Sequence, residues 1–180
     1  MPLHFNAVIP GNNHGTRTKT VFSPFNRDVV GTVTTSGNVD VEKALVNAQR
    51  LFSNRTTWLT VSERINVLQN LTTMMHARFE ELVILAVREG GKPLIDSRVE
   101  VSRAIEGVEL CVDCLKTQTS GQTPMAINQA SEGKLSFSQL EPIGIVVAVS
   151  AFNHPLNLIV HQIAPAIASG CPVIVKPAAA

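Results

Sequence analysis

The stretch that decides the fold is EPIGIVVAVSAFNHPLNLIVHQIAPAIASGCPVIVK, residues 141–176. Its first apolar run, IGIVVAV at 143–149, is rich in β-branched residues, which is typical of a strand buried on both faces of a parallel sheet. Pro155 suits the first position of a helix, Gly170 ends the helical pattern, and PVIVK at 172–176 predicts a second strand. The segment therefore predicts a strand, a helix and a parallel strand, joined by a right-handed crossover.

The two predicted strands end at the same edge of their sheet, and α/β folds bind ligands at this edge. Residues after Val149 should therefore lie near Lys176, which brings Asn153 and Lys176 to one side. Cys171 precedes the second strand, about five residues of roughly 3.3 Å each from Lys176, so it is badly placed as a nucleophile. Asn153 taken alone is equally compatible with a turn or a helix cap.

The predicted helix carries polar residues on the side opposite its apolar positions. His154, Asn157 and His161 are spaced i, i+3, i+7, which aligns them on that side. They are either the wall of a site or an ordinary solvated helix face.

The first part of the chain predicts short strands followed by helices. AVIPG, TKTVFSPFN and VVGTVTT are strand-like pieces broken by Pro, Gly and Asn, and we expect them to pair antiparallel. Thr60-x-x-Glu63 is a capping-box pattern, and the helical region behind it is long enough for two helices before Gly90–Gly91.

A further helix is predicted after Pro93. Its apolar residues recur at steps of 4, 3, 4 and 3 and form one inward stripe: Val101, Ile105, Val108, Val112 and Leu115. The charged residues between them are expected on a solvated face: Glu100, Arg103 and Glu106.

Residues 117–140 change in character and become rich in Thr, Ser, Gln and Gly. QTPMAI and KLSFSQL alternate as strands do, around NQASEG, and this pattern predicts a protruding hairpin. A hairpin with unpaired edges and little core of its own is either covered by another subunit or mobile.

Composition limits the classes of function. The chain has 180 residues, 44% of them hydrophobic, and a formal net charge of +1, so it can bury one sizeable core and offers little attraction to nucleic acid or anionic lipid. We expect no nucleic-acid or membrane partner, and a soluble, cytoplasmic protein. The three cysteines are an odd number, and Cys111-x-x-Cys114 lacks a second pair of ligands, so we expect no metal site.

The motifs together resemble those of NAD(P)-dependent aldehyde dehydrogenases. EPIGIVVAVSAFNHPLNL and APAIASGCPVIVKPA are similar to the family patterns EP-x-G, PWNFPL, APAL-x-x-GN and KP, and SPFNRDVVGTV, SERINVL and EGGKPLIDSRVEV match upstream in family order. The resemblance implies an α/β fold, namely the start of a Rossmann-like parallel-sheet dinucleotide-binding domain with N-terminal helices and a protruding oligomerisation β-hairpin. The expected parts are the N-terminal part of the dinucleotide-binding domain (1–116), the oligomerisation hairpin (117–140) and the first βαβ unit of the dinucleotide-binding sheet (141–180), without the catalytic domain.

The resemblance also implies roles for individual residues. Asn153 matches the asparagine whose side-chain amide helps to form the oxyanion hole for the thiohemiacetal. The positions that match contacts to NAD or NADP are Val149, Ser150, Ala151, Phe152, Lys176 and Ala179, and those that match the substrate tunnel are His154, Asn157, Leu158 and His161. Lys176 matches the lysine that binds the adenosine ribose, and Ala179 stands where many NAD-specific members have a ribose-binding glutamate.

The sequence departs from the family pattern at several places. Ala151–Phe152 replaces Pro-Trp, and Gln162 occupies the usual lysine position. The family's catalytic cysteine, general-base glutamate and G-x-T-x-x-G turn would lie beyond Ala180, so we expect an N-terminal portion of a larger aldehyde-oxidising enzyme that forms homo-oligomers through the hairpin. The alternative is a non-catalytic fragment that acts as a subunit-interaction or weak nucleotide-binding module.

Overall fold

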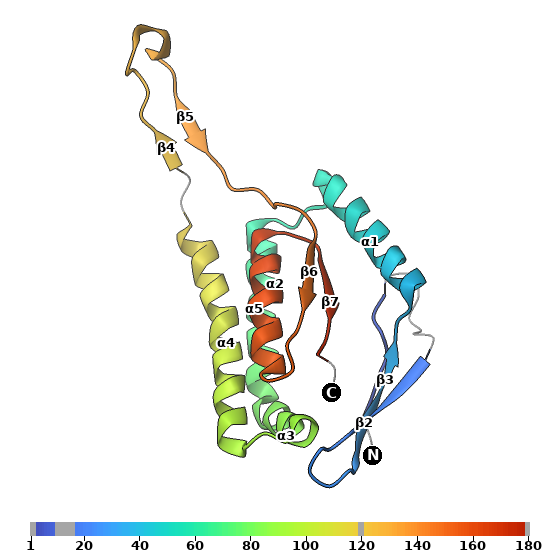
Figure 1. The fold of residues 1–180 in the computed structure, drawn as a ribbon. Helices are drawn as coiled ribbons and strands as arrows, with labels where there is room; N and C mark the ends of the chain where they lie inside the picture. The colour runs from blue at the N-terminus through green and yellow to red at the C-terminus, as the bar shows by residue number, and fades with distance from the viewer. Residues whose placement is uncertain (1–2, 10–16, 119–120, 179–180) are drawn as a thin grey trace.

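The computed structural model describes residues 3–9, 17–118 and 121–178 (Figure 1). In chain order the elements are β1 (Leu3–Phe5), β2 (Arg17–Phe22), β3 (Val29–Thr35), α1 (Asn38–Ser53), η1 (Arg55–Thr57), α2 (Val61–Ala77), α3 (Phe79–Gly90), α4 (Leu94–Thr117), β4 (Gly121–Thr123), η2 (Gln129–Ser131), β5 (Ser136–Ser138), β6 (Val146–Val149), α5 (Pro155–Ser169) and β7 (Val173–Lys176). None of the helices in the described part of the chain is both long and apolar enough to cross a membrane.

The strand–helix–strand order predicted at 141–176 is confirmed, but β6 is shorter than the 143–149 run and is not buried on both faces, because Val147 and Val149 are exposed. β6 and β7 pair in parallel, from Val146 opposite Val173 to Val149 opposite Lys176. α5 connects them and ends at Gly170, whose positive φ of 82° is readily available to glycine. Figure 1 shows α5 between this sheet and the helices α2 and α4.

The helical layer follows its capping signals. The Thr60 hydroxyl accepts from the Glu63 amide at 3.2 Å, and the Glu63 carboxylate accepts from the Thr60 amide at 2.8 Å, which completes the predicted capping box of α2. α2 ends at Ala77 and α3 begins at Phe79, so the two-helix prediction is confirmed.

The core lies where α2, α4 and α5 meet, with a contribution from α3. Its buried residues are Leu68, Met75, Val83, Val101, Ala104, Ile105, Val108, Val112, Val160, Ala164 and Ala168. The predicted apolar stripe of α4 faces this core, with Leu115 partly buried at its end. The expected position of Glu100 is wrong, because this residue is buried rather than solvated.

The N-terminal sheet has the order β1-β3-β2. β2 and β3 are antiparallel as predicted, but β1 pairs in parallel with β3 and lies upstream of the AVIPG segment expected to form a strand. A Cβ on Gly31 would lie 2.7 Å from the carbonyl oxygen of Leu3. The lack of a side chain at Gly31 therefore permits the close approach of β1, which no local pattern in β1 itself indicates.

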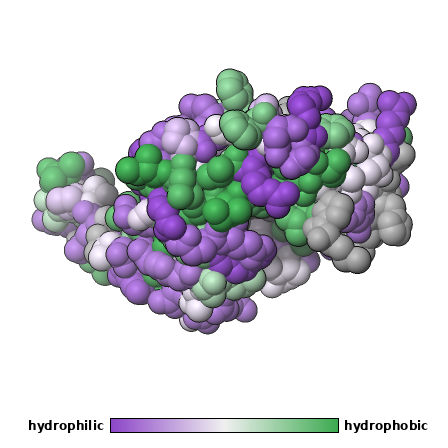
Figure 2. All heavy atoms as spheres, turned by 90° about the horizontal axis from the view of Figure 1, so that it is seen from below, coloured by the Kyte–Doolittle hydropathy of each residue, from purple (hydrophilic) through white to green (hydrophobic). Residues whose placement is uncertain are grey.

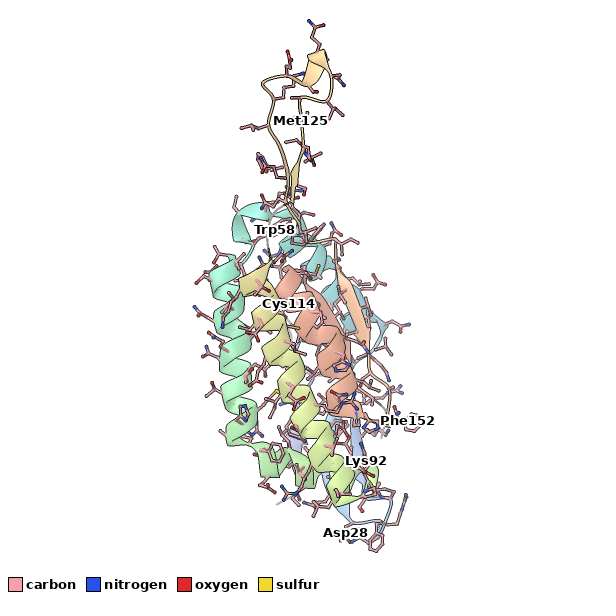
Figure 3. All side chains as sticks on the ribbon, turned by 90° about the vertical axis from the view of Figure 1, so that its left-hand side faces the viewer. Asp28, Trp58, Lys92, Cys114, Met125 and Phe152 are labelled. Carbon is pink, nitrogen blue, oxygen red and sulfur yellow. The ribbon has the colours of Figure 1, made fainter. Side chains whose placement is uncertain are left out.

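β4 and β5 pair antiparallel and project away from the helices (Figure 1). Only three residues of each strand pair, from Gly121 opposite Ser138 to Thr123 opposite Ser136, so the strands are shorter than the two alternating segments of the sequence. Met125 lies in this projection, far from Lys92 and Phe152 at the other end of the molecule (Figure 3).

Candidate functional site

The carboxyl edge of the β6–β7 sheet brings together the residues expected there. Val149 lies opposite Lys176, and the Ser150 amide donates to the Lys176 carbonyl at 3.1 Å. Asn153 follows three residues later, in the turn that leads into α5. The predicted convergence of this turn and Lys176 at one edge is therefore confirmed.

Side chains hold both ends of the turn at residues 150–154. The Ser150 hydroxyl lies 3.1 Å from the carbonyl oxygens of Ala151 and Pro155, and the Gln162 amide donates to the Val149 carbonyl at 3.1 Å. Asn153 itself is exposed, and its side chain has no hydrogen-bond partner in the part of the chain that the structure describes. The turn thus presents a free amide on a fixed backbone.

The N-terminus of α5 is capped by a residue from another helix. Leu156 and Asn157 donate their backbone amides to Oε1 of Glu100 in α4, at 2.9 and 3.3 Å. The N-cap residue His154 makes no side-chain cap, and Pro155 has no amide hydrogen to satisfy. The helix end is therefore satisfied without Asn153, which removes the need for Asn153 as a cap.

Glu100 forms a largely buried ion pair with Lys92 beside the half-exposed ring of His154, and we call these three residues the Lys92 cluster. The Glu100 side chain is 0% exposed and that of Lys92 is 14% exposed, and the Lys92 ammonium donates to Oε2 of Glu100. Nδ1 of His154 lies 2.9 Å from Lys92 Nζ and 3.6 Å from Oε2 of Glu100. The negative charge of Glu100 is thus paired inside the protein, as burial requires.

The cluster also orients His154. An ammonium group has three donors and no acceptor, so Nδ1 of His154 must accept from Lys92 and the ring proton must lie on Nε2. The His154 side chain is 43% exposed, and its Nε2–H is directed away from Lys92. This N–H is a hydrogen-bond donor next to Asn153 in the chain.

The contacts of Lys92, Glu100 and Gln162 were not predicted from the sequence. The signal for the first two was a Lys after a Gly-Gly helix end, followed eight residues later by a Glu within an apolar stripe. A carboxylate one residue before the buried Val101 must either be paired or point out of the core, and only tertiary contacts decide between these outcomes.

The expected open polar face of α5 is interrupted at Asn157. His161 is exposed and lies against α4, with its Cδ2 3.5 Å from the position of a Cβ on Gly107, and Leu158 is half-buried. Asn157 is 4% exposed, and its Oδ1 has no hydrogen-bond partner among the described residues. The three polar residues therefore differ in burial, with His154 half-buried, Asn157 buried and His161 exposed, and they do not form one solvated face.

Because this oxygen is buried without a partner, we expect Asn157→Leu to raise the free energy of unfolding by about 1 kcal/mol or more. The apolar side chain has a similar shape and removes the unsatisfied acceptor. Urea unfolding of the protein that carries this chain measures the change. Asn157→Ala is the control, and it should destabilise because it leaves a cavity. A loss of stability in Asn157→Leu would show that Oδ1 has a partner in the whole protein.

The cysteines do not form this site. Cys171 is buried at the start of the β7 segment, at the opposite edge from Lys176. Burial raises the pKa of the Cys171 thiol, but hydrogen bonds from Ser169 and from the amides of Gly144 and Ile143, together with the charge of Arg64, bring the pKa below its usual value. Burial and then the neighbouring Cys114 raise the pKa of Cys111.

Within residues 3–9, 17–118 and 121–178, no group of three or more His, Cys, Asp or Glu residues could hold a metal ion.

The residues expected to bind a dinucleotide surround the same edge. Val149 is 56% and Phe152 77% exposed, and Ala151 and Lys176 are exposed as well. Seen from this end of the molecule, Figure 2 shows apolar surface bordered by hydrophilic side chains. Ser150 is buried with its hydroxyl and amide already bonded, and Ala179 lies outside the described residues. The edge therefore offers an open apolar surface beside one ammonium group.

Comparison with known proteins identifies the family. The sequence profile of the aldehyde dehydrogenase family matches residues 12–180. Lactaldehyde dehydrogenase of Methanocaldococcus jannaschii is 31% identical over 87% of this chain and 32% of its own length. Aldehyde dehydrogenase 21 from Physcomitrella patens, solved with the reaction product succinate, is 29% identical with a TM-score of 0.88, over 98% of this chain and 37% of that chain.

A further solved structure agrees. Glyceraldehyde-3-phosphate dehydrogenase of Methanocaldococcus jannaschii, complexed with NADP, is 31% identical with a TM-score of 0.79, over 90% of this chain and 34% of that chain. The chain spans about a third of the length of the curated relatives that it matches. With the parallel βαβ unit and the motifs at its carboxyl edge, these matches show that the chain belongs to the aldehyde dehydrogenase family.

Proposed function

We propose that the protein carrying this chain oxidises an aldehyde to a carboxylic acid. In this proposal a cysteine beyond the chain attacks the aldehyde and forms a thiohemiacetal, and water later releases the acid from the thioester. NAD or NADP, when bound, accepts the hydride. The observation that carries the proposal is the exposed amide of Asn153 at the carboxyl edge of β6, on a backbone fixed from both sides.

Asn153 has the chemistry of an oxyanion donor. Its amide N–H groups carry no titratable proton, so they stabilise negative charge on the thiohemiacetal oxygen across the whole physiological pH range. A donor of this kind must be held in place before the reaction, and the bonds of Ser150, Gln162 and Glu100 hold the backbone on both sides of it. The Asn153 side chain is not needed to cap α5, because Glu100 accepts the hydrogen bonds of its first amides.

The carboxyl edge offers the types of group that bind a dinucleotide, namely apolar surface and a hydrogen-bond donor. Val149 and Phe152 provide exposed apolar surface, and the Lys176 ammonium can donate to ribose hydroxyls. Ala179 supplies no carboxylate to repel a 2′-phosphate, so we propose that the protein accepts either NAD or NADP. The solved NADP complex of a 31% identical relative supports the second cofactor.

A cofactor reduction assay with a panel of aldehydes tests the proposal on the whole protein. We expect turnover with both cofactors, at efficiencies within about tenfold of each other, which is about 1.4 kcal/mol. An absence of aldehyde-dependent reduction with either cofactor would overturn the proposed activity. A much larger preference for NAD would instead overturn only the role given to Ala179.

We further propose a short polar or anionic aldehyde as the substrate, with His154 and His161 facing it. The relatives named above act on lactaldehyde or glyceraldehyde-3-phosphate, or bind succinate as the product. Replacement of both histidines by Phe is expected to lower kcat/KM for a short hydroxy- or carboxy-aldehyde by about tenfold or more relative to an aliphatic aldehyde, because donors to the polar group are lost. An unchanged ratio of the two kcat/KM values would show that the histidines do not select the substrate.

We also propose that the β4–β5 projection joins copies of the protein. It exposes four large apolar side chains, and so much apolar surface on a thin projection is typical of an interface: Ile127, Leu135, Phe137 and Leu140. This surface also favours the alternative of a subunit-interaction module without turnover.

Phe137→Asp with Leu135→Asp is expected to shift the protein to a smaller assembly, because two charges would be buried without partners. Light scattering after size exclusion measures the mass. Ser138→Asp is a control at the strand end, where the side chain is exposed and polar. An unchanged mass in the double variant would exclude this projection as the interface.

A further inference from the structure

α5 carries no charged residue in its own sequence, from Pro155 to Ser169. Its two ends are nevertheless matched to the helix dipole by residues of other helices. Glu100 of α4 binds the amides at the N-terminus, and Arg64 of α2 donates to the Ala168 carbonyl at the C-terminus. A carboxylate at the positive end and a guanidinium at the negative end both stabilise the helix.

Glu100 binds the backbone directly after the proposed oxyanion donor in the chain. Its carboxylate binds the amides of the third and fourth residues after Asn153, and the intervening Pro155 has its φ restrained by its ring. The bond to Asn157 is buried and the bond to Leu156 is partly buried, and Lys92 balances the charge that makes both bonds strong. The backbone between Asn153 and Asn157 thus has one rigid attachment to α4.

We propose that Glu100 is a positioning residue for Asn153, which fixes the start of α5 and thereby the place of the Asn153 amide. This inference rests on the proposed oxyanion role of Asn153. Oxyanion stabilisation depends on donors held at the correct distance before the reaction, and a displacement of about 1 Å can cost about a hundredfold in rate. Glu100 does not touch the substrate in this proposal; it acts through two backbone amides.

The experiment measures the rate of acylation in single turnovers of the whole protein, with thermal unfolding and cofactor affinity on the same samples. Glu100→Ala is expected to slow acylation by about tenfold to a hundredfold and to leave the cofactor Kd within about twofold. Glu100→Gln combined with Lys92→Met keeps an oxygen that accepts from Leu156 and Asn157 and leaves no unpaired charge. With an aliphatic aldehyde, whose binding does not use the His154 donor, this double variant should recover most of the rate.

Arg64→Met is the matched control, because it removes the attachment at the other end of the same helix. It should lower stability but keep the acylation rate of the folded protein within about twofold. If Glu100 supported only the fold, Glu100→Ala would behave in the same way, and the proposal would fail.

The pair Asn153→Ala and Asn153→Ala/Glu100→Ala separates this inference from the proposed function. If Glu100 acts through Asn153, the double variant is slower than Asn153→Ala by no more than about threefold. Losses that multiply would refute the positioning role, and so would a native rate in Glu100→Ala beside a slow Asn153→Ala. A native rate in Asn153→Ala would refute the oxyanion function and this inference together.

If Glu100→Ala does not fold, Glu100→Asp takes its place. This variant withdraws the carboxylate by one methylene and should slow acylation several-fold.

Discussion

Asn153→Ala in the whole protein is expected to slow acylation by about a hundredfold or more, while cofactor affinity stays nearly intact. In the proposed mechanism the amide is needed only when negative charge develops on the aldehyde oxygen. The loss should therefore fall on the chemical step of a single turnover, and it should be similar for good and poor aldehyde substrates.

The structure sharpens the control for this experiment. Loss of a helix cap typically costs about 1 kcal/mol of stability and would leave the chemical step unchanged. Because Glu100 satisfies the first amides of α5, Asn153→Ala should barely change the melting temperature. Asn153→Asp keeps the shape but places a carboxylate where the proposed mechanism forms the oxyanion, so it should be at least as slow as Asn153→Ala. A native acylation rate with a lowered melting temperature would return Asn153 to the role of a structural residue.

The fold of the βαβ unit could be predicted because its signals are local. A β-branched run, a proline at the first helical position and a glycine at the helix end each determine backbone geometry within a few residues. The same is true of the Thr60–Glu63 capping box and of Gly91, which ends α3 with a positive φ of 64°. Parallel pairing of the two strands then brings Asn153 to the edge beside Lys176.

The contacts that organise the site could not be predicted in this way. Glu100 binds helix amides 56 and 57 residues further along the chain, and Lys92 lies 62 residues before His154. Helical periodicity gave the apolar stripe of α4 but treated every charged residue as solvated, so it missed a carboxylate that is buried because its partners arrive from elsewhere. The burial of Asn157 was missed for the same reason, since its helical spacing allowed a solvated face and residues from elsewhere in the chain bury it.

Lys92→Met is expected to lower the free energy of unfolding by about 3 to 5 kcal/mol, the largest stability change among the variants considered. The Glu100 side chain is 0% exposed, so removal of the ammonium leaves a buried carboxylate without its ion-pair partner, with only Nδ1 of the half-exposed His154 nearby, 3.6 Å from Oε2. The two amides of α5 still donate to it, but two backbone dipoles do not replace a full charge. Denaturant unfolding of Lys92→Met beside the parent protein measures the loss.

The double variant Lys92→Met/Glu100→Gln decides whether the unpaired charge is the cause. Gln has nearly the shape of Glu and keeps an oxygen for the amides of Leu156 and Asn157, while Met fills much of the volume of the Lys92 stem. The buried pair is then replaced by neutral groups, an exchange that is often close to neutral in stability, so the double variant should be markedly more stable than Lys92→Met alone. If the two losses simply added, the cost would come from packing at each position and not from an isolated carboxylate. The account of Glu100 as a buried, charged cap of α5 would then be wrong, even though the contacts to Leu156 and Asn157 remained.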